Sequence, residues 1–170
     1  MPTLTDFVIL AAAHALRLVP GANAAWADGA VRMYDSVDIA LAVNTPTGLI
    51  APVIRQADRK TLEEIALETR TLATRAREGI LQPTDYVGGT FTISNLGMYG
   101  VESLYAIVNP PQSCILGIGA ALAQPVAFGQ EVRVARVMAC TLSADHRVID
   151  GALGAELLLA VKDYIERAGS

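Results

Sequence analysis

The sequence has little that would suit it to nucleic acids, metals or membranes. It holds 13 Lys and Arg against 17 Asp and Glu, a net charge of −4, and 5% aromatic residues, so it offers neither a basic patch nor stacking platforms for nucleic acid. It contains no CxxC pair, His/Cys cluster or HExxH motif, which predicts no metal site. Arg17, Asp38 and Asn44 interrupt its longest apolar runs before they reach the roughly 18 residues of a membrane span. We expect no nucleic acid, no metal and no membrane partner.

Cysteines are few, and the first residues do not have the pattern of a targeting signal. Cys114 and Cys140 are the only two cysteines, and they lie inside apolar runs at 113–118 and 134–142. We expect both to be reduced and buried, where a thiol behaves as a small hydrophobic group. The first residues lack the basic head and small-residue cleavage site of a signal peptide, so a cytoplasmic location is expected.

Hydrophobic residues make up 52% of the 170 residues and charged residues 18%. This length predicts a single domain, 1–170, with one core that buries about two-thirds of the unfolded surface. The apolar excess fits either a well-filled monomer core or an extensive subunit interface, and composition does not choose between them.

Helical and strand patterns alternate along the chain. Thr61 and Glu64 have the spacing of a capping box, and Gly79 suits the end of the same helix. The run from Asn44 to Gly48 holds the Pro and Gly of a turn, which predicts a hairpin. Together the patterns predict an α/β fold with a mixed β-sheet flanked by helices. The expected helices are 6–18, 61–79 and 152–167, and the expected strands are 37–43, 49–54, 89–94, 113–118 and 132–142.

The strongest chemical signal is a histidine followed four residues later by an aspartate, His146 and Asp150, directly before Gly151. Histidine exchanges protons near neutral pH because its ordinary pKa is about 6.5. Asp150 can tune or hold the His146 loop, or it can have a structural role, as a cap of the helix that follows or in an internal ion pair that shapes the turn; both readings stay open. His14, the other histidine, lies on a helical stripe without an acid or nucleophile nearby, and we expect it to be a packed or surface residue.

The surroundings of this pair resemble a known family. Residues 142–152, with His146, Asp150 and Gly151, are similar to the His-x-x-x-Asp-Gly signature of the dihydrolipoamide acyltransferases, the E2 components of 2-oxoacid dehydrogenase complexes. Residues 88–98 and 108–119 are similar to two further hallmarks. The segments 5–8, 23–24 and 45–53 follow in the order that the family shows. The resemblance therefore covers nearly the whole chain.

The resemblance implies the chloramphenicol-acetyltransferase-like fold, assembled as homotrimers with active sites in channels between subunits and as a larger cubic or dodecahedral core. His146 is then the base that deprotonates the thiol of coenzyme A, or of dihydrolipoamide in reverse. Ser94, which matches the family's hydroxyl position, is the donor to the tetrahedral oxyanion. Because Ser94 lies 52 positions before His146 on a different expected strand, the pair has to meet by folding, and the family implies that it meets across a subunit boundary. Coenzyme A is a substrate, and the lipoyl group belongs to a separate domain.

The sequence departs from the family pattern at its N-terminal end. The family's catalytic domain begins with a helix and a strand before the segment that matches Thr5, and these are not found here. The lipoyl domain and the subunit-binding domain that recruits the E1 or E3 component are not found either. Residues 1–170 are therefore expected to be the C-terminal part of an E2 catalytic domain, N-terminally shortened.

Two hypotheses follow for the function. In the first, the chain is an acyltransferase that moves an acyl group between the dihydrolipoyl arm and coenzyme A; the group is acetyl, because residues 94–98 and 109–112 most resemble the pyruvate dehydrogenase branch. In the second, it is a non-catalytic structural core subunit or an inactive fragment of such a complex. Intact His146, Ser94 and Asp150 favour the first hypothesis, and the shortened front favours the second.

Two other motifs do not fit their usual functions. Ser94, His146 and Asp150 do not form a hydrolase triad, because Ser94 is not in a Gly-x-Ser-x-Gly turn and Asp150 follows His146 in the chain. The stretch from Gly117 to Gly119 lacks the third glycine of a dinucleotide loop. We expect those glycines to pack tightly in the sheet, with no nicotinamide cofactor.

Overall fold

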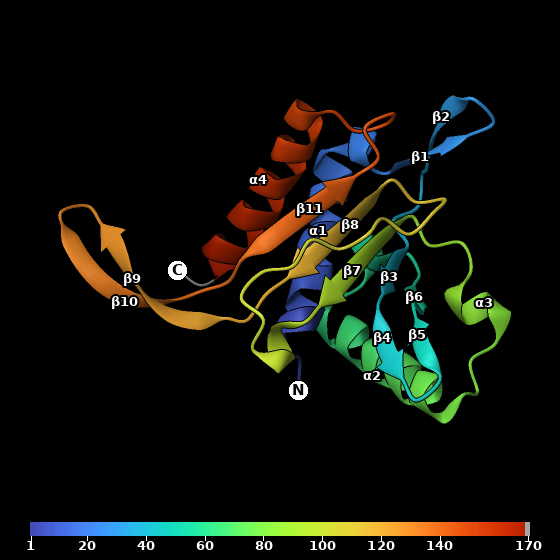
Figure 1. The fold of residues 1–170 in the computed structure, drawn as a ribbon, viewed down its shortest axis with the longest axis horizontal. Helices are drawn as coiled ribbons and strands as arrows, with labels where there is room; N and C mark the ends of the chain where they lie inside the picture. The colour runs from blue at the N-terminus through green and yellow to red at the C-terminus, as the bar shows by residue number, and fades with distance from the viewer. Residues whose placement is uncertain (169–170) are drawn as a thin grey trace.

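A five-stranded mixed sheet forms the centre of the molecule in the computed structural model, which describes residues 1–168 (Figure 1). The central strand β7 runs parallel to its neighbours β3 and β8, and the edge strands β11 and β6 are antiparallel to theirs. The predicted α/β fold with a mixed sheet is therefore confirmed. In spatial order the strands are β11 (Cys140–Ala144), β8 (Cys114–Ile118), β7 (Phe91–Asn95), β3 (Ile39–Leu41) and β6 (Val53–Ile54).

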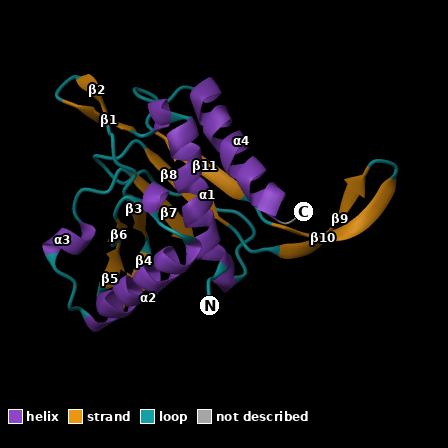
Figure 2. Ribbon diagram, turned by 180° about the vertical axis from the view of Figure 1, so that it is seen from behind, coloured by secondary structure: helices purple, strands orange, loops and turns teal. Residues whose placement is uncertain are grey.

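Helices α1 (Leu4–Leu18), α2 (Leu62–Glu78) and α4 (Gly151–Ala168) cover one face of this sheet (Figure 2). Their apolar stripes form the core with the inward side chains of the strands, which burial from water stabilises. All three helices are near their expected positions. The largest fully buried side chains include Ile9, Leu16, Ile39, Ile65, Phe91, Ile93, Leu116 and Leu157.

The ends of α2 confirm the signals read from the sequence. Thr61 accepts the Glu64 N–H at 3.2 Å, and the Glu64 carboxylate accepts the Thr61 N–H at 2.7 Å. These bonds satisfy two orphan donors of the first turn and hold the pKa of Glu64 below its ordinary value. At the other end Gly79 adopts a φ of 71°, the left-handed conformation that glycine accepts without strain.

Three antiparallel hairpins and a helical turn surround the sheet. The predicted hairpin around Asn44–Gly48 is confirmed, with Val43 opposite Ile50, but its strands are shorter than expected and separate from β3 and β6. The hairpins pair β1 (Ala24–Ala27) with β2 (Ala30–Met33), β4 (Val43–Thr45) with β5 (Gly48–Ile50) and β9 (Leu122–Phe128) with β10 (Glu131–Val137); the turn is α3 (Pro83–Tyr86).

The prediction of a single long strand at 132–142 is wrong. Residues 131–137 pair only with β9, whereas residues 140–144 pair with β8 in the central sheet. The β9–β10 hairpin projects away from the body of the molecule (Figures 1 and 2), and Val132 and Val134 are 73% and 77% exposed. Alternating apolar residues thus predicted strand structure correctly here without predicting which sheet the strand joins.

The expectation that Gly117 and Gly119 pack tightly is confirmed. A Cβ at Gly117 would lie 2.8 Å from Leu104 Cγ and 2.9 Å from Thr141 Oγ1, and a Cβ at Gly119 would overlap the Glu102 carbonyl. Glycine at these positions lets the 101–104 segment run directly against β8.

Candidate active site

Ser94 lies on the face of β7 that the helices leave uncovered. Because side chains alternate across a strand, Phe91 and Ile93 point into the helical core, whereas Thr92 and Ser94 point to the opposite side. There they line a cleft of about 770 Å³. The rest of its wall comes from β5, the α3–β7 loop and the segment 104–112. Its other lining residues include Leu49, Ile50, Tyr86, Val87, Leu96, Leu104, Tyr105, Ile107 and Gln112.

The Ser94 hydroxyl is available within this cleft. Ser94 is half-buried, and within residues 1–168 no other group hydrogen bonds to its Oγ. The polar neighbours, in contrast, are satisfied: Thr92 Oγ1 donates to the buried Gln112 side chain, and Asn95 Nδ2 donates to Thr5 Oγ1 at 2.7 Å. An unpaired hydroxyl on a fixed strand can donate a hydrogen bond to a bound molecule.

His146 lies in the turn that follows β11. The Asp145 N–H donates to the Ser113 carbonyl at 2.8 Å. The Arg147 guanidinium binds the Asp145 carboxylate through two nitrogens, at 2.7 and 3.0 Å, and lies over the Trp26 ring with its Cζ 5.4 Å from the ring centroid. The hydrogen bonds from Arg147 hold the pKa of Asp145 below its ordinary value. Residues on both sides of His146 are thus fixed, while its own side chain is exposed.

Asp150 caps α4. Its Oδ1 accepts the Leu153 N–H at 2.8 Å, at the third position of the helix, and its carbonyl accepts the Gly154 N–H at 3.0 Å. Of the two readings that the sequence left open, the structure supports the helix cap. The cap also fixes where the His146 turn ends and the helix begins.

Replacing Asp150 by alanine is therefore expected to destabilise the protein by about 1 kcal/mol, because the Leu153 N–H loses its acceptor. Asp150→Asn keeps a capping oxygen and is expected to stay within a few tenths of a kcal/mol of the native chain. Urea unfolding at one fixed protein concentration measures the free energy of unfolding of both variants. Equal destabilisation by alanine and asparagine would contradict the capping role.

One chain does not bring Ser94 and His146 together. The register places Ser94 opposite Gly117 and Gly117 opposite Thr141, so Ser94 lies two strands away from Thr141 at the same level. His146 is five residues beyond Thr141. At strand spacing the end of β11 at Ala144 lies about 10 Å from Ser94 across the strands and about 10 Å along them, and His146 is in the turn beyond it. Each chain therefore presents the serine and the histidine at different ends of its sheet.

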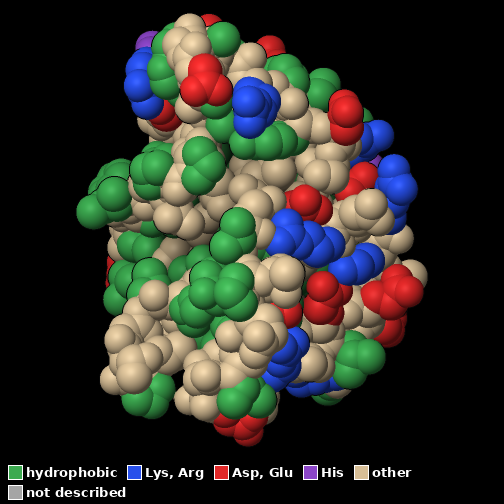
Figure 3. Space-filling model, turned by 90° about the vertical axis from the view of Figure 1, so that its right-hand side faces the viewer, with side chains coloured by type: hydrophobic (Ala, Val, Ile, Leu, Met, Phe, Trp, Pro, Cys, Tyr) green, Lys and Arg blue, Asp and Glu red, His purple; other side chains and the backbone are tan. Residues whose placement is uncertain are grey.

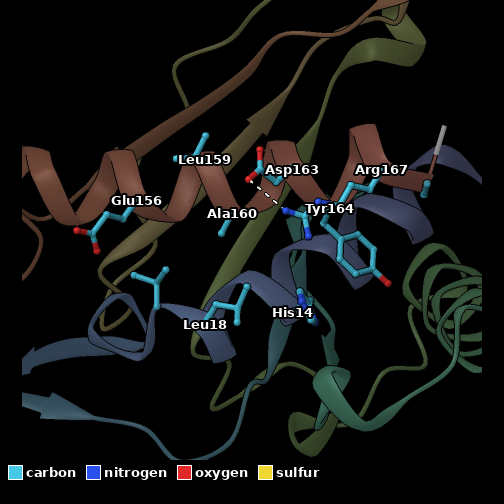
Figure 4. Close-up of a pocket in the computed structure, with 10 residues that line it drawn as sticks. His14, Leu18, Glu156, Leu159, Ala160, Asp163, Tyr164 and Arg167 are labelled. Atoms are coloured by element: carbon cyan, nitrogen blue, oxygen red, sulfur yellow. Dashed lines mark ion pairs between the residues drawn. The ribbon is translucent and has the colours of Figure 1, made fainter. Parts of the chain in front are cut away.

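A second cleft, of about 650 Å³, lies between α1 and α4 (Figure 4). His14 on α1 faces α4 there, with its ring centroid 4.9 Å from that of Tyr164. Asp163 and Arg167 form an ion pair at 3.9 Å along the same wall. None of the predicted site residues lines this cleft. His14 is exposed, as expected of a surface residue.

The two cysteines are free thiols that lie away from the cleft. Cys114 is 1% exposed, and burial, together with the charge of Asp145, raises its pKa to about 12. Cys140 is half-buried, less buried than expected, and its pKa is also raised by burial. Thiols that stay protonated are poor nucleophiles, so neither provides the chemistry of the site.

Within residues 1–168, no three His, Cys, Asp or Glu side chains are grouped to hold a metal ion. In the same part of the chain, no helix has the length and apolar character needed to cross a bilayer.

Several features of the site were not found from the sequence. The Gln112 contact to Thr92, the Trp26 contact to Arg147 and the cleft itself join segments that are far apart along the chain. Thr92, Gln112 and Arg147 each belong to a family-like segment, but Trp26 does not, and the segments do not say which residues meet.

The α/β fold with its mixed sheet is chloramphenicol-acetyltransferase-like. The chloramphenicol acetyltransferase structure matches it with a TM-score of 0.59 at 18% identity, over 95% of this chain and 77% of that one. The family model "2-oxoacid dehydrogenases acyltransferase (catalytic domain)" matches residues 1–170. The chain belongs to this family.

Similar proteins agree with this family. A dihydrolipoyllysine-residue acetyltransferase component of pyruvate dehydrogenase complex from Rickettsia bellii is 50% identical over 96% of this chain and 39% of that protein. A mitochondrial one from Arabidopsis thaliana is also 50% identical, over 96% of this chain and 31% of that protein. The chain thus spans about two-fifths or less of the length of these relatives.

Solved structures match more completely. A probable dihydrolipoamide acetyltransferase from Listeria monocytogenes has a TM-score of 0.94 at 35% identity, over 97% of this chain and 70% of that one. The dihydrolipoamide acetyltransferase from Azotobacter vinelandii has a TM-score of 0.92 at 37% identity, over 95% of this chain and 67% of that one. A cubic core of the pyruvate dehydrogenase multienzyme complex has a TM-score of 0.92 at 38% identity, also over 95% of this chain and 67% of that one.

Proposed function

We propose that this chain is the catalytic core of an acyltransferase that moves an acetyl group between a dihydrolipoyl arm and coenzyme A. The observation that carries this proposal is that the chain has both a free serine hydroxyl in a cleft and an exposed histidine on a fixed turn. Work on the Azotobacter relative addresses the roles of a serine, a histidine and an asparagine in its mechanism, with spacings of 52 and 4 residues. Ser94, His146 and Asp150 have the same spacings.

In this mechanism His146 takes the proton from the attacking thiol, whose ordinary pKa of about 8.5 leaves it mostly protonated at pH 7. The thiolate sulfur forms a bond to the thioester carbonyl carbon, and the carbonyl electron pair moves onto oxygen. Ser94 donates a hydrogen bond to that oxyanion. The carbon–sulfur bond to the leaving thiol then breaks, and His146 returns the proton to the departing sulfur.

Asp150 takes no part in proton transfer in this scheme. It caps α4 and so fixes the end of the His146 turn, which positions the base. The asparagine of the Azotobacter relative can cap a helix equally well.

A homotrimer supplies the complete site. His146 of one subunit faces Ser94 of its neighbour, because the two residues lie at different ends of the sheet in a single chain. The uncovered sheet face supports such an assembly, since it exposes large apolar side chains, which a subunit interface would bury. Figure 3 shows hydrophobic side chains gathered on one half of the molecular face and charged ones on the other. The most exposed of those that line the cleft on this face include Ile107 (91%), Tyr105 (86%) and Leu49 (73%).

The projecting β9–β10 hairpin supports the same conclusion. An isolated two-stranded hairpin is only marginally stable in water, and its residues Phe128, Val132 and Val134 are at least half exposed. Packing against another subunit would stabilise it. The relative whose cubic core is solved supports a larger core built from such trimers. The cytoplasmic location stays a prediction.

The proposed function is tested by transfer of acetyl from acetyl-coenzyme A to free dihydrolipoamide, with the mass of the particle measured in the same buffer. Transfer by a trimeric or larger particle is the expected result. A folded, assembled particle that transfers no acetyl would contradict the proposed function and support the non-catalytic core subunit.

A further inference from the structure

One wall of the Ser94 cleft is a loop with little structure of its own. Tyr86, the last residue of α3, and residues 87–89 between α3 and β7 line the cleft directly. The preceding helix α3 has only four residues, too few to be stable alone. Tyr86 and Val87 are 39% and 59% exposed, so core packing does not fix them. Another contact has to hold this wall in place.

Arg75 pairs with the Asp85 carboxylate of α3 at 2.7 Å. Arg55 provides the contact to the backbone of the loop. It follows edge strand β6 directly, and its guanidinium spans the loop. Nη1 donates to the Gly88 carbonyl at 3.0 Å, and Nη2 donates to the carbonyls of Thr84, at 3.0 Å, and Val87. Three acceptors on one short segment match the planar, forked donors of arginine. The side chain is 39% exposed and is absent from the cleft lining.

Asp38 holds Arg55 from the sheet side. Its Oδ2 lies 3.7 Å from Arg55 Nη1. The carboxylate is itself fixed, because Oδ1 accepts the Gln56 N–H at 2.8 Å and Oδ2 accepts the Ser36 hydroxyl at 3.0 Å. It is 13% exposed. The Asp38 carbonyl also accepts the Thr90 N–H at 2.7 Å, where the loop enters β7. The same residue therefore anchors Arg55 and the end of the loop.

The cleft suits an uncharged molecule. Among the described residues that line it, none is Asp, Glu, Lys, Arg or His. A polyphosphate such as that of coenzyme A would find no cationic partner on this wall, whereas an aliphatic dithiol would bury apolar surface against Leu49, Val87 and Ile107.

From these contacts we infer that Arg55 is a positioning residue, which holds the 84–88 wall so that the cleft binds the neutral dithiol substrate. This role rests on the proposed function. Arg55 touches neither the reacting atoms nor the cleft. It acts through backbone carbonyls, so its loss changes substrate binding more than the chemical step.

The test uses the full chain with three variants. Arg55→Met removes all donors, Arg55→Lys keeps the charge beside Asp38 but cannot reach three carbonyls at once, and Arg77→Met removes an exposed arginine of α2 as a matched control. For Arg55→Met the KM for dihydrolipoamide is expected to rise about tenfold, with kcat within about threefold and the KM for acetyl-coenzyme A within about twofold. For Arg55→Lys the KM for dihydrolipoamide should lie between those of Arg55→Met and the native chain. For Arg77→Met it should equal that of the native chain.

A second readout does not depend on activity. Amide hydrogen exchange at residues 84–88 is expected to quicken in Arg55→Met, while exchange in α1 stays unchanged. An unchanged KM for dihydrolipoamide in an active Arg55→Met protein would overturn the role of Arg55, whether or not exchange quickens. Equal rises in both KM values with faster exchange in α1 would also overturn it, because they indicate general loss of structure. A native chain without transfer activity would instead overturn the proposed function, and the exchange comparison would still show whether Arg55 fixes the wall.

Discussion

Replacing His146 by alanine is expected to lower the rate of acetyl transfer by about 10²- to 10⁴-fold, the usual contribution of a positioned acid–base group. The reason is chemical: of the two carboxylates on the turn, that of Asp145 is occupied by Arg147 and that of Asp150 caps α4, so neither replaces the imidazole as the base. Acetyl transfer from acetyl-coenzyme A to dihydrolipoamide measures the effect. Because His146 is exposed, stability and assembly should not change.

His14→Ala is the matched control for this variant. His14 is the other histidine of the chain and is also exposed, in the cleft between α1 and α4. It is expected to keep the native rate. A His146→Ala protein that assembles and transfers acetyl at the native rate would exclude His146 as the base.

The second large effect is expected for Ser94→Ala, which should lower kcat by about 10²- to 10³-fold, as loss of one oxyanion donor does. The hydroxyl acts only when negative charge develops on the carbonyl oxygen, so kcat and kcat/KM should fall together. Steady-state kinetics with each substrate varied in turn separate the two constants. The hydroxyl has no partner within residues 1–168, so its removal should leave folding unchanged.

Ser103→Ala removes a hydroxyl from an exposed serine outside the cleft lining and should behave like the native chain. If Ser94→Ala raised KM and left kcat unchanged, Ser94 would serve ground-state binding, and the oxyanion role would be wrong.

Local signals predicted the local structure well. The Thr61–Glu64 capping box, Gly79 and the turn at Asn44–Gly48 each depend on residues a few positions apart, and each is present in the structure. The position of Asp150 directly before the expected last helix likewise made a helix cap one of its two readings, and the structure shows the cap. Such features could be predicted because their hydrogen bonds close within one turn of chain.

Long-range partners could not be predicted in this way. Residues 132–142 look like one strand, but a break at 138–139 sends their two halves to different sheets. Arg55 reaches the carbonyls of residues 29 to 33 positions later, and no periodicity records such a contact. The distance between Ser94 and His146 depends on strand order and register, which the residues alone did not indicate. The family resemblance implied only that the pair meets across a subunit boundary.

The most direct test of the shared site mixes two inactive variants. His146→Ala and Ser94→Ala chains are unfolded together in equal amounts, refolded and assayed for acetyl transfer, beside each variant refolded alone. If each site takes His146 from one subunit and Ser94 from its neighbour, random cyclic trimers contain intact sites at about one quarter of all positions. The mixture is then expected to regain about a quarter of the native activity. Mass measurement of the particles shows whether mixed trimers have formed. If they have formed and are as inactive as the separate variants, a site shared between subunits is contradicted.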